Sequence, residues 1–162
     1  MFAELVLEME NHSEHLVDVL GELYQELNFN DEWKGQFFTP QPVSDLMGRL
    51  AFNDKAYKEK GYITVHEPCC GGGSIIYGFA NAMRDAGLNY QKDSLIFAND
   101  IDERCVFMTY IQCSLYGIPA IVQQKDELQD KVLGDAWFTP MFVLYSWRWK
   151  NVLNREMLNY GA

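Results

Sequence analysis

The sequence predicts an α/β fold in which a short parallel sheet is covered by helices. Strand-like runs at residues 62–66 and 94–98 are each followed by a helical stretch, and a third run at residues 118–123 comes directly after the second helix. Strands that alternate with helices at this spacing are typical of right-handed crossovers and parallel pairing. Ligands of such sheets bind beyond the carboxyl ends of the strands, so we expect the functional site there.

The first 27 residues are predicted to be helical. Phe2, Met9, Leu16 and Leu23 are spaced seven apart, although the polar run at residues 10–15 leaves two shorter helices as an alternative. This apolar stripe either packs on its own domain or forms a helix-helix seam in a homodimer. We expect residues 1–32 to be an N-terminal helical extension and residues 33–162 to be the main domain.

Turn residues separate the elements that follow. Residues 28–40 are expected to form a loop, and Gln41-Pro42 to begin a helix, since proline favours the first helical turn. The first strand ends at Glu67-Pro68, before a glycine cluster. The helices after the first two strands are predicted at residues 74–86 and 103–116, closed by Gly87 and Gly117.

The C-terminal part gives a weaker pattern. Residues 141–145 could form a fourth strand, and about the last fifteen residues are expected to be helical. The segment Trp147-Arg148-Trp149-Lys150 alternates aromatic and basic residues. It is either a strand that buries two tryptophans or a stacking platform for bases.

Composition limits the classes of function. The 162 residues carry 13 Lys and Arg against 23 Asp and Glu, a formal charge of -10, which disfavours a broad phosphate-binding surface. Nucleic-acid contact should therefore be local or shared with a partner. We expect a cytoplasmic protein, because no membrane span or secretory signal is indicated. The four cysteines are expected to be reduced thiols, and the histidines lack the spacing of metal ligands, so no metal site is predicted.

The most informative segment is Glu67-Pro68-Cys69-Cys70-Gly71-Gly72-Gly73. Glycines let the backbone pass close to a ligand, while the acid at the strand end can reach a cationic group of that ligand. A dinucleotide fingerprint would need a small residue at position 76, where Ile76 stands, so nicotinamide binding is disfavoured. A purely structural turn is the alternative.

A second acid, Asp100, stands at the end of the second strand, where a carboxylate can accept hydrogen bonds from both hydroxyls of a ribose. Ile101 could pack on an adenine ring. Asp102 is predicted to be the N-cap of the next helix. Two acids at adjacent strand ends suit an adenosine that is linked to an amino acid.

Three motifs resemble those of S-adenosylmethionine-dependent, adenine-specific DNA methyltransferases, in particular the modification subunits of type I restriction-modification systems. Gly35-Gln36-Phe37-Phe38-Thr39-Pro40 matches a family element at all six positions. The glycine-rich segment is similar to the family's Asp-Pro-Ala-Cys-Gly-Ser-Gly-Gly turn, and Ala98-Asn99-Asp100-Ile101-Asp102 to its second-strand acid. The resemblance covers about residues 33–142 and implies a short Rossmann-like methyltransferase sheet.

The resemblance also implies roles for individual residues. Phe38, Thr39 and Pro40 would close over the methionine part of S-adenosylmethionine. Its amino-acid end would be held by Glu67, Gly71 and Gly73, and its ribose by Asp100. Cys70 corresponds to the family's cysteine in the turn. The predicted cofactor-binding residues are thus Phe38, Thr39, Pro40, Glu67, Cys70, Gly71, Gly73, Asp100 and Ile101.

The chain departs from the family at its catalytic element. The family uses Asn/Asp-Pro-Pro-Tyr/Phe to hold the amino group of a flipped adenine and to stack on the base. Here the nearest equivalent is Thr139-Pro140-Met141-Phe142, in which a hydroxyl replaces the amide or carboxylate. These four residues are either a degenerate catalytic element or a turn before a strand. The roles of Asp126 and Asp135 stay open.

Two functions follow from the resemblance. The first is methyl transfer to DNA adenine, with a partner from a restriction-modification system supplying target recognition or the missing base-holding group. The second is a catalytically inactive, cofactor-binding regulator or antagonist of such a system. Weak or partner-assisted DNA binding is expected in the first case.

Overall fold

The computed structural model describes residues 2–27 and 39–146. Four helices precede the sheet: α1 (Phe2–Asn11), α2 (Val19–Glu26), α3 (Gln41–Ala51) and α4 (Asp54–Lys60). The strands are β1 (Ile63–Glu67), β2 (Ser94–Asp100), β3 (Ala120–Asp126) and β4 (Lys131–Phe138). The remaining helices are α5 (Ser74–Asp85), α6 (Tyr90–Asp93), α7 (Glu103–Tyr116) and α8 (Pro140–Leu144).

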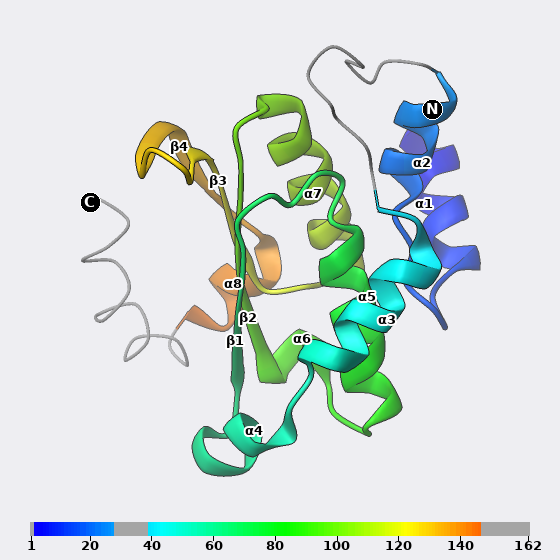
Figure 1. Cartoon of the computed structure of the whole chain (residues 1–162). Helices are drawn as coiled ribbons and strands as arrows, with labels where there is room; N and C mark the ends of the chain where they lie inside the picture. The colour runs from blue at the N-terminus through cyan, green and yellow to red at the C-terminus, as the bar shows by residue number, and fades with distance from the viewer. Residues whose placement is uncertain (1, 28–38, 147–162) are drawn as a thin grey trace.

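The strands form one sheet in the order β1-β2-β3-β4 (Figure 1). β1 pairs with β2 and β2 with β3 in parallel, and β4 returns antiparallel to β3. Helices α5 and α7 connect the parallel strands, which makes this a short Rossmann-like sheet with helices before it. The predicted fold class is therefore confirmed, including the parallel pairing of the three predicted strands.

Glycines end α5 and α7 as predicted. Gly117 has a φ of 69° and caps α7, whose bounds match the predicted helix. The C-cap of α5 is Ala86, and Gly87 follows it with a φ of 78°. At both positions a left-handed backbone is required, which glycine adopts without the steric cost of a Cβ.

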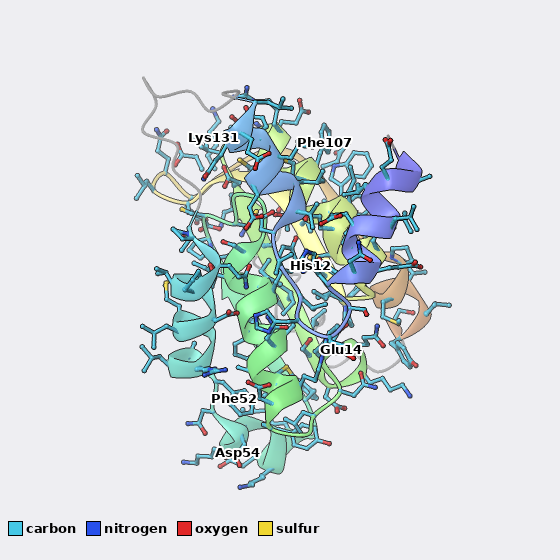
Figure 2. The ribbon with its side chains drawn as sticks, turned by 90° about the vertical axis from the view of Figure 1, so that its right-hand side faces the viewer. His12, Glu14, Phe52, Asp54, Phe107 and Lys131 are labelled. Carbon is cyan, nitrogen blue, oxygen red and sulfur yellow. The ribbon has the colours of Figure 1, made fainter. Side chains whose placement is uncertain are left out.

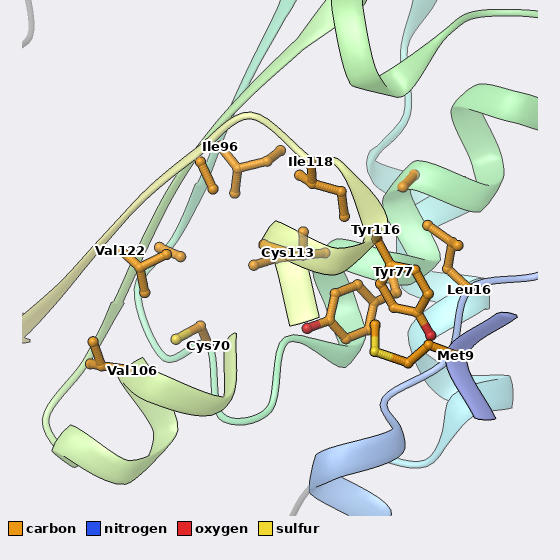
Figure 3. Packing of buried hydrophobic residues seen from close by; sticks show 14 residues of the cluster. Met9, Leu16, Cys70, Tyr77, Ile96, Val106, Cys113, Tyr116, Ile118 and Val122 are labelled. Atoms are coloured by element: carbon orange, nitrogen blue, oxygen red, sulfur yellow. The ribbon is translucent and has the colours of Figure 1, made fainter. Parts of the chain in front are cut away.

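The main core lies between the sheet and the helices on one of its faces. Ile96 and Val122 point from the sheet toward Tyr77 of α5 and Cys113 of α7 (Figure 3). Leu95, Phe97 and Ile121 face the other way, where Phe142 of α8 packs on them. Because side chains alternate along a strand, the two clusters come from alternate positions of the same strands.

The N-terminal region consists of two helices, α1 and α2. The prediction of a single helix was therefore wrong, and the alternative of two shorter helices is confirmed. Met9 and Leu16 are buried in the main core beside Tyr77, whereas Leu23 is 46% exposed. The connection that contains His12 and Glu14 crosses over the helical side of the molecule (Figure 2). Two residues of the apolar stripe, Met9 and Leu16, thus pack within the chain. A homodimer stays a prediction.

The segment at residues 141–145 was predicted as a strand, and this was wrong because Pro140–Leu144 is helix α8. Pro140 stands in the first helical turn, where its missing N–H costs nothing. The strand that the sequence did not predict, β4, is largely exposed and pairs with β3 after a tight connection. Its mixed polarity gives no period of two, which explains the omission.

Other predictions concern covalent and membrane features. None of the four cysteines, all of which the structure describes, forms a disulfide, as expected. None of the helices in the described ranges is long and apolar enough to cross a bilayer. The Trp147-to-Lys150 segment and the predicted C-terminal helix lie outside the described residues.

Candidate functional site

The glycine-rich turn between β1 and α5 is held at its amino side by the neighbouring strand. The Cys70 N–H donates to the Asn99 carbonyl of β2 at 2.8 Å, and the Gly73 N–H donates back to the Cys70 carbonyl at 2.7 Å. Gly71 and Gly73 have φ values of 55° and 101°, which exclude most side chains. The turn is therefore fixed to the carboxyl end of β2.

The carbonyl groups of the turn point back toward the helices. Thr109 of α7 donates its hydroxyl hydrogen to the Gly71 carbonyl at 2.9 Å. The Gly72 carbonyl accepts from the Gln112 amide at 2.9 Å and from the Tyr77 hydroxyl at 2.8 Å. Buried side chains thus satisfy these carbonyls from behind, and they fix the conformation of the turn.

Asp100 lies at the carboxyl end of β2 and contacts the turn directly. Its Oδ2 accepts the Gly71 N–H at 2.9 Å, and its Oδ1 accepts the Asp102 N–H at 2.9 Å. Each carboxylate oxygen has a second acceptor position, so the group can still bind ligand hydroxyls. Burial raises the pKa of Asp100, and the two backbone donors oppose this shift.

Glu67 ends β1 beside the same turn. Its carboxylate accepts the Cys69 N–H at 3.2 Å, and its pKa is raised mainly by burial and further by the nearby charge of Asp100. Within the described ranges, neither acid has an ion pair with Lys, Arg or His. A cationic ligand would favour the ionised form of both acids.

Helix α3 places Thr39 and Pro40 at the same end of the molecule as the turn. Asp45 accepts from Asn81 at 3.3 Å and Arg49 pairs with Asp85 at 3.2 Å, so α3 and α5 run in the same direction. The beginnings of the two helices are therefore adjacent, as Figure 1 shows. Pro40 is exposed at the N-cap of α3. Phe38 lies outside the described residues.

Two other predicted cofactor residues differ in their exposure. The Cys70 side chain is 6% exposed and belongs to the main core, so only its backbone lies along the turn. Ile101 is 59% exposed next to Asp100, where an apolar ring could cover it. Both cofactor roles stay predictions.

The segment Thr139-Pro140-Met141-Phe142 begins at the amino ends of the parallel strands, opposite to the glycine-rich turn. The Thr139 hydroxyl donates to the Ile118 carbonyl at 2.8 Å and accepts the Ala120 N–H at 2.9 Å, where β3 begins. Glu67 and Asp100 stand where β1 and β2 end. Phe142 is 5% exposed in the second core cluster. The structure gives these residues packing and hydrogen-bonding roles, and does not bring them to the glycine-rich turn.

Asp102 and Asp126 have partners close to them in the sequence. Asp102 accepts the Arg104 N–H at 2.9 Å, which confirms the predicted N-cap of α7. Asp126 accepts two N–H groups of the turn after β3, and Asp135 is exposed on β4. Glu127, which the sequence did not single out, accepts from Asn99 at 2.6 Å and from Lys125 at 3.2 Å.

Sequence reasoning missed the side chains that hold the turn from behind. Thr109 and Gln112 are both 0% exposed on α7, which carries apolar residues on several sides. Two polar residues three apart on the buried face of a helix indicate that this face bonds to polar groups elsewhere, because buried polar groups need partners. The identity of those partners depends on the tertiary structure.

Known proteins similar to this chain include a family of enzymes and a solved structure. The model of the family described as N-6 DNA methylase matches residues 15–143. Among solved structures, the type I restriction-modification system methyltransferase subunit from Streptococcus thermophilus is 27% identical over 52% of this chain, with a TM-score of 0.41. The match covers 16% of that subunit's length.

Proposed function

Because the chain belongs to the N-6 DNA methylase family, we propose that the carboxyl edge of its sheet binds S-adenosylmethionine. Glu67 and the turn would hold the amino-acid part of the cofactor, and Asp100 would accept hydrogen bonds from the ribose hydroxyls. Phe38, Thr39 and Pro40 would cover the methionine part, and Ile101 would pack on the adenine. The cofactor itself would supply an activated methyl group on sulfur.

One observation carries this proposal. Two acids with raised pKa values flank a glycine-rich turn at adjacent strand ends, without a cation from the described residues. A positive ligand bound between them would stabilise the ionised form of both carboxylates. The same edge of a parallel sheet is where this architecture binds its ligands.

Calorimetric titration with S-adenosylmethionine tests the proposal. We expect saturable binding of one equivalent, and weaker binding of the demethylated product, S-adenosylhomocysteine, because the product lacks the sulfonium charge. Adenosine alone should bind more weakly than either compound. Absence of saturable binding by the cofactor would refute the proposal.

We further propose that methyl transfer to DNA adenine depends on a partner of the restriction-modification type. The observation that favours a partner is the position of Thr139, whose hydroxyl is 0% exposed and bonded at the far edge of the sheet. From this position, the Thr139-to-Phe142 segment cannot hold an adenine amino group at the turn. A partner could supply both that group and target recognition.

The same observation favours a second function, a cofactor-binding regulator that does not transfer methyl groups. Incubation with unmethylated DNA and cofactor carrying a radiolabelled methyl group, with and without candidate modification subunits, separates the two. Label in adenine only in the presence of a partner supports partner-dependent transfer. Cofactor binding with no label under either condition supports the regulator.

A further inference from the structure

Asp18 is a buried acid that lies directly behind the glycine-rich turn, although it belongs to the N-terminal region. It is 4% exposed and caps α2, where its Oδ1 accepts the Gly21 N–H at 2.8 Å. The same oxygen accepts from the Gln112 side-chain amide at 2.8 Å. That Gln112 nitrogen also donates to the Gly72 carbonyl, so one amide group links Asp18 to the turn.

The other oxygen of Asp18 lies against two glycines. Oδ2 is buried and has no hydrogen-bond partner in the described part of the chain. A Cβ built on either Gly21 or Gly72 would overlap this oxygen. Gly72 does not have a positive φ, so its backbone conformation permits alanine, and the three atoms nearest to the added Cβ all belong to Asp18. The carboxyl group therefore sets how closely α2 approaches the turn.

Helix α7 holds the residues around Asp18 in place. The Gln112 carbonyl oxygen accepts the Leu20 N–H at 3.1 Å, and the Tyr116 hydroxyl donates to the Val17 carbonyl at 2.9 Å. Gln112 itself is 0% exposed. The Leu20 N–H, the Asp18 carboxylate and the Gly72 carbonyl thus all bond to one buried glutamine, which makes their positions interdependent.

We propose that Asp18 is a positioning residue of the cofactor site, which sets the conformation of the glycine-rich turn from behind and makes α2 part of the cofactor-binding unit. The identity of the ligand rests on the proposed function above. A turn that is fixed before the ligand arrives binds it more tightly, because less conformational freedom is lost on binding. Residues before position 33 would then contribute to affinity without touching the cofactor.

A double-mutant cycle between Asp18→Ala and Gly72→Ala tests the contact without any ligand. Gly72→Ala should lower the melting temperature of the wild-type protein, because its methyl group overlaps Asp18 Oδ2. In the Asp18→Ala background the same change should cost clearly less, since the overlapping atom is gone. An equal loss of stability in both backgrounds would overturn the inference.

Hydrogen exchange gives a second readout that does not need the cofactor. In Asp18→Ala, the amides of residues 71–73 should exchange faster, while those in the middle of α5 should keep their protection. Glu26→Gln is the matched control, because Glu26 is an exposed acid on the same helix. Unchanged exchange at the turn in Asp18→Ala would count against a positioning role.

Cofactor affinity is the third readout, measured by calorimetry at a temperature where every variant is folded. Asp18→Ala should raise the Kd for S-adenosylmethionine by about tenfold or more. Asp18→Asn keeps the size of the side chain and an acceptor for Gln112 and Gly21, so we expect a rise of less than about threefold. Glu26→Gln should bind like the wild type.

The outcomes separate the inference from the proposed function. If the wild type binds the cofactor and Asp18→Ala binds equally well, Asp18 is not a positioning residue. If the wild type does not bind the cofactor, the proposed function fails. The double-mutant cycle and the exchange at residues 71–73 then decide whether Asp18 shapes the turn.

Discussion

Thr139→Val is the substitution that best separates a structural role from a catalytic role for the Thr139-to-Phe142 segment. Valine keeps the branched shape of threonine but removes the hydroxyl. That hydroxyl is fully buried, donates to the Ile118 carbonyl at 2.8 Å and accepts the Ala120 N–H at 2.9 Å. Ile118 and Ala120 are themselves 1% and 0% exposed, so water cannot replace the lost partner.

The expected loss follows from these two bonds. A buried donor or acceptor left without a partner costs about 1–3 kcal/mol, so two such groups should lower the free energy of unfolding by about 2–6 kcal/mol. For a chain of this length, each kcal/mol corresponds to a fall of about 2–4 °C in melting temperature. We therefore expect Thr139→Val to melt at least about 4 °C below the wild type.

Urea unfolding followed by circular dichroism measures this loss, and Thr139→Ser is the control. Serine keeps both hydrogen bonds and loses one methyl group, which should cost about 1 kcal/mol. Cofactor affinity should change little in either variant when both are measured well below their melting temperatures. A Thr139→Val protein as stable as the wild type would refute the structural role that we assign to this hydroxyl.

Further predictions concern the turn, its acids, the thiols and the packing of α3. Asp100→Ala should weaken binding of S-adenosylmethionine by about 1–3 kcal/mol in calorimetry, because the ribose loses a charged acceptor; unchanged affinity would remove Asp100 from the site. The raised pKa values of Glu67 and Asp100 mean that the folded state binds more protons than the unfolded state above the ordinary carboxyl range. The free energy of unfolding of the ligand-free protein should therefore fall as pH rises through that window, whereas cofactor affinity, which needs ionised acids, should rise. Urea titrations and calorimetry between about pH 5 and 7 check both signs, and parallel trends would contradict this interpretation. Cys69 is the exposed thiol, so a disulfide reagent should modify one cysteine before the other three in the native protein and all four in denaturant; native reaction of several thiols at the same rate would disprove it. Gly48→Ala should lower the free energy of unfolding by about 1–3 kcal/mol or more, because its methyl group would overlap the backbone of Gly78 where α3 meets α5; a variant with wild-type stability in urea would show that the helices do not pack this closely.

Local patterns in the sequence determined most of the fold. The bounds of α7 follow from Asp102 as a side-chain cap and Gly117 as a left-handed stop, which are properties of a few consecutive residues. The β-branched and apolar runs indicated β1, β2 and β3, and their alternation with helices indicated parallel pairing. Given that pairing, Glu67 and Asp100 had to stand at one edge of the sheet.

Where local patterns were ambiguous, the prediction depended on packing that the sequence does not display. Residues 141–145 are apolar enough for either a strand or a helix. Pro140 and the position of Phe142 over Leu95 and Phe97 favour the helix. Strand β4 has no alternating pattern, because it is an edge strand that is mostly exposed on both faces.

The sequence alone identified the glycine-rich turn, the acid at each strand end and the family motifs, because each of these lies within a short stretch of chain. Only the tertiary structure decided that Asp18 and Gln112, 94 residues apart, meet behind that turn. It also decided that Thr139 is bonded at the far end of β3. Both results depend on which buried polar groups find partners across the fold, and this is settled only when the helices pack on the sheet.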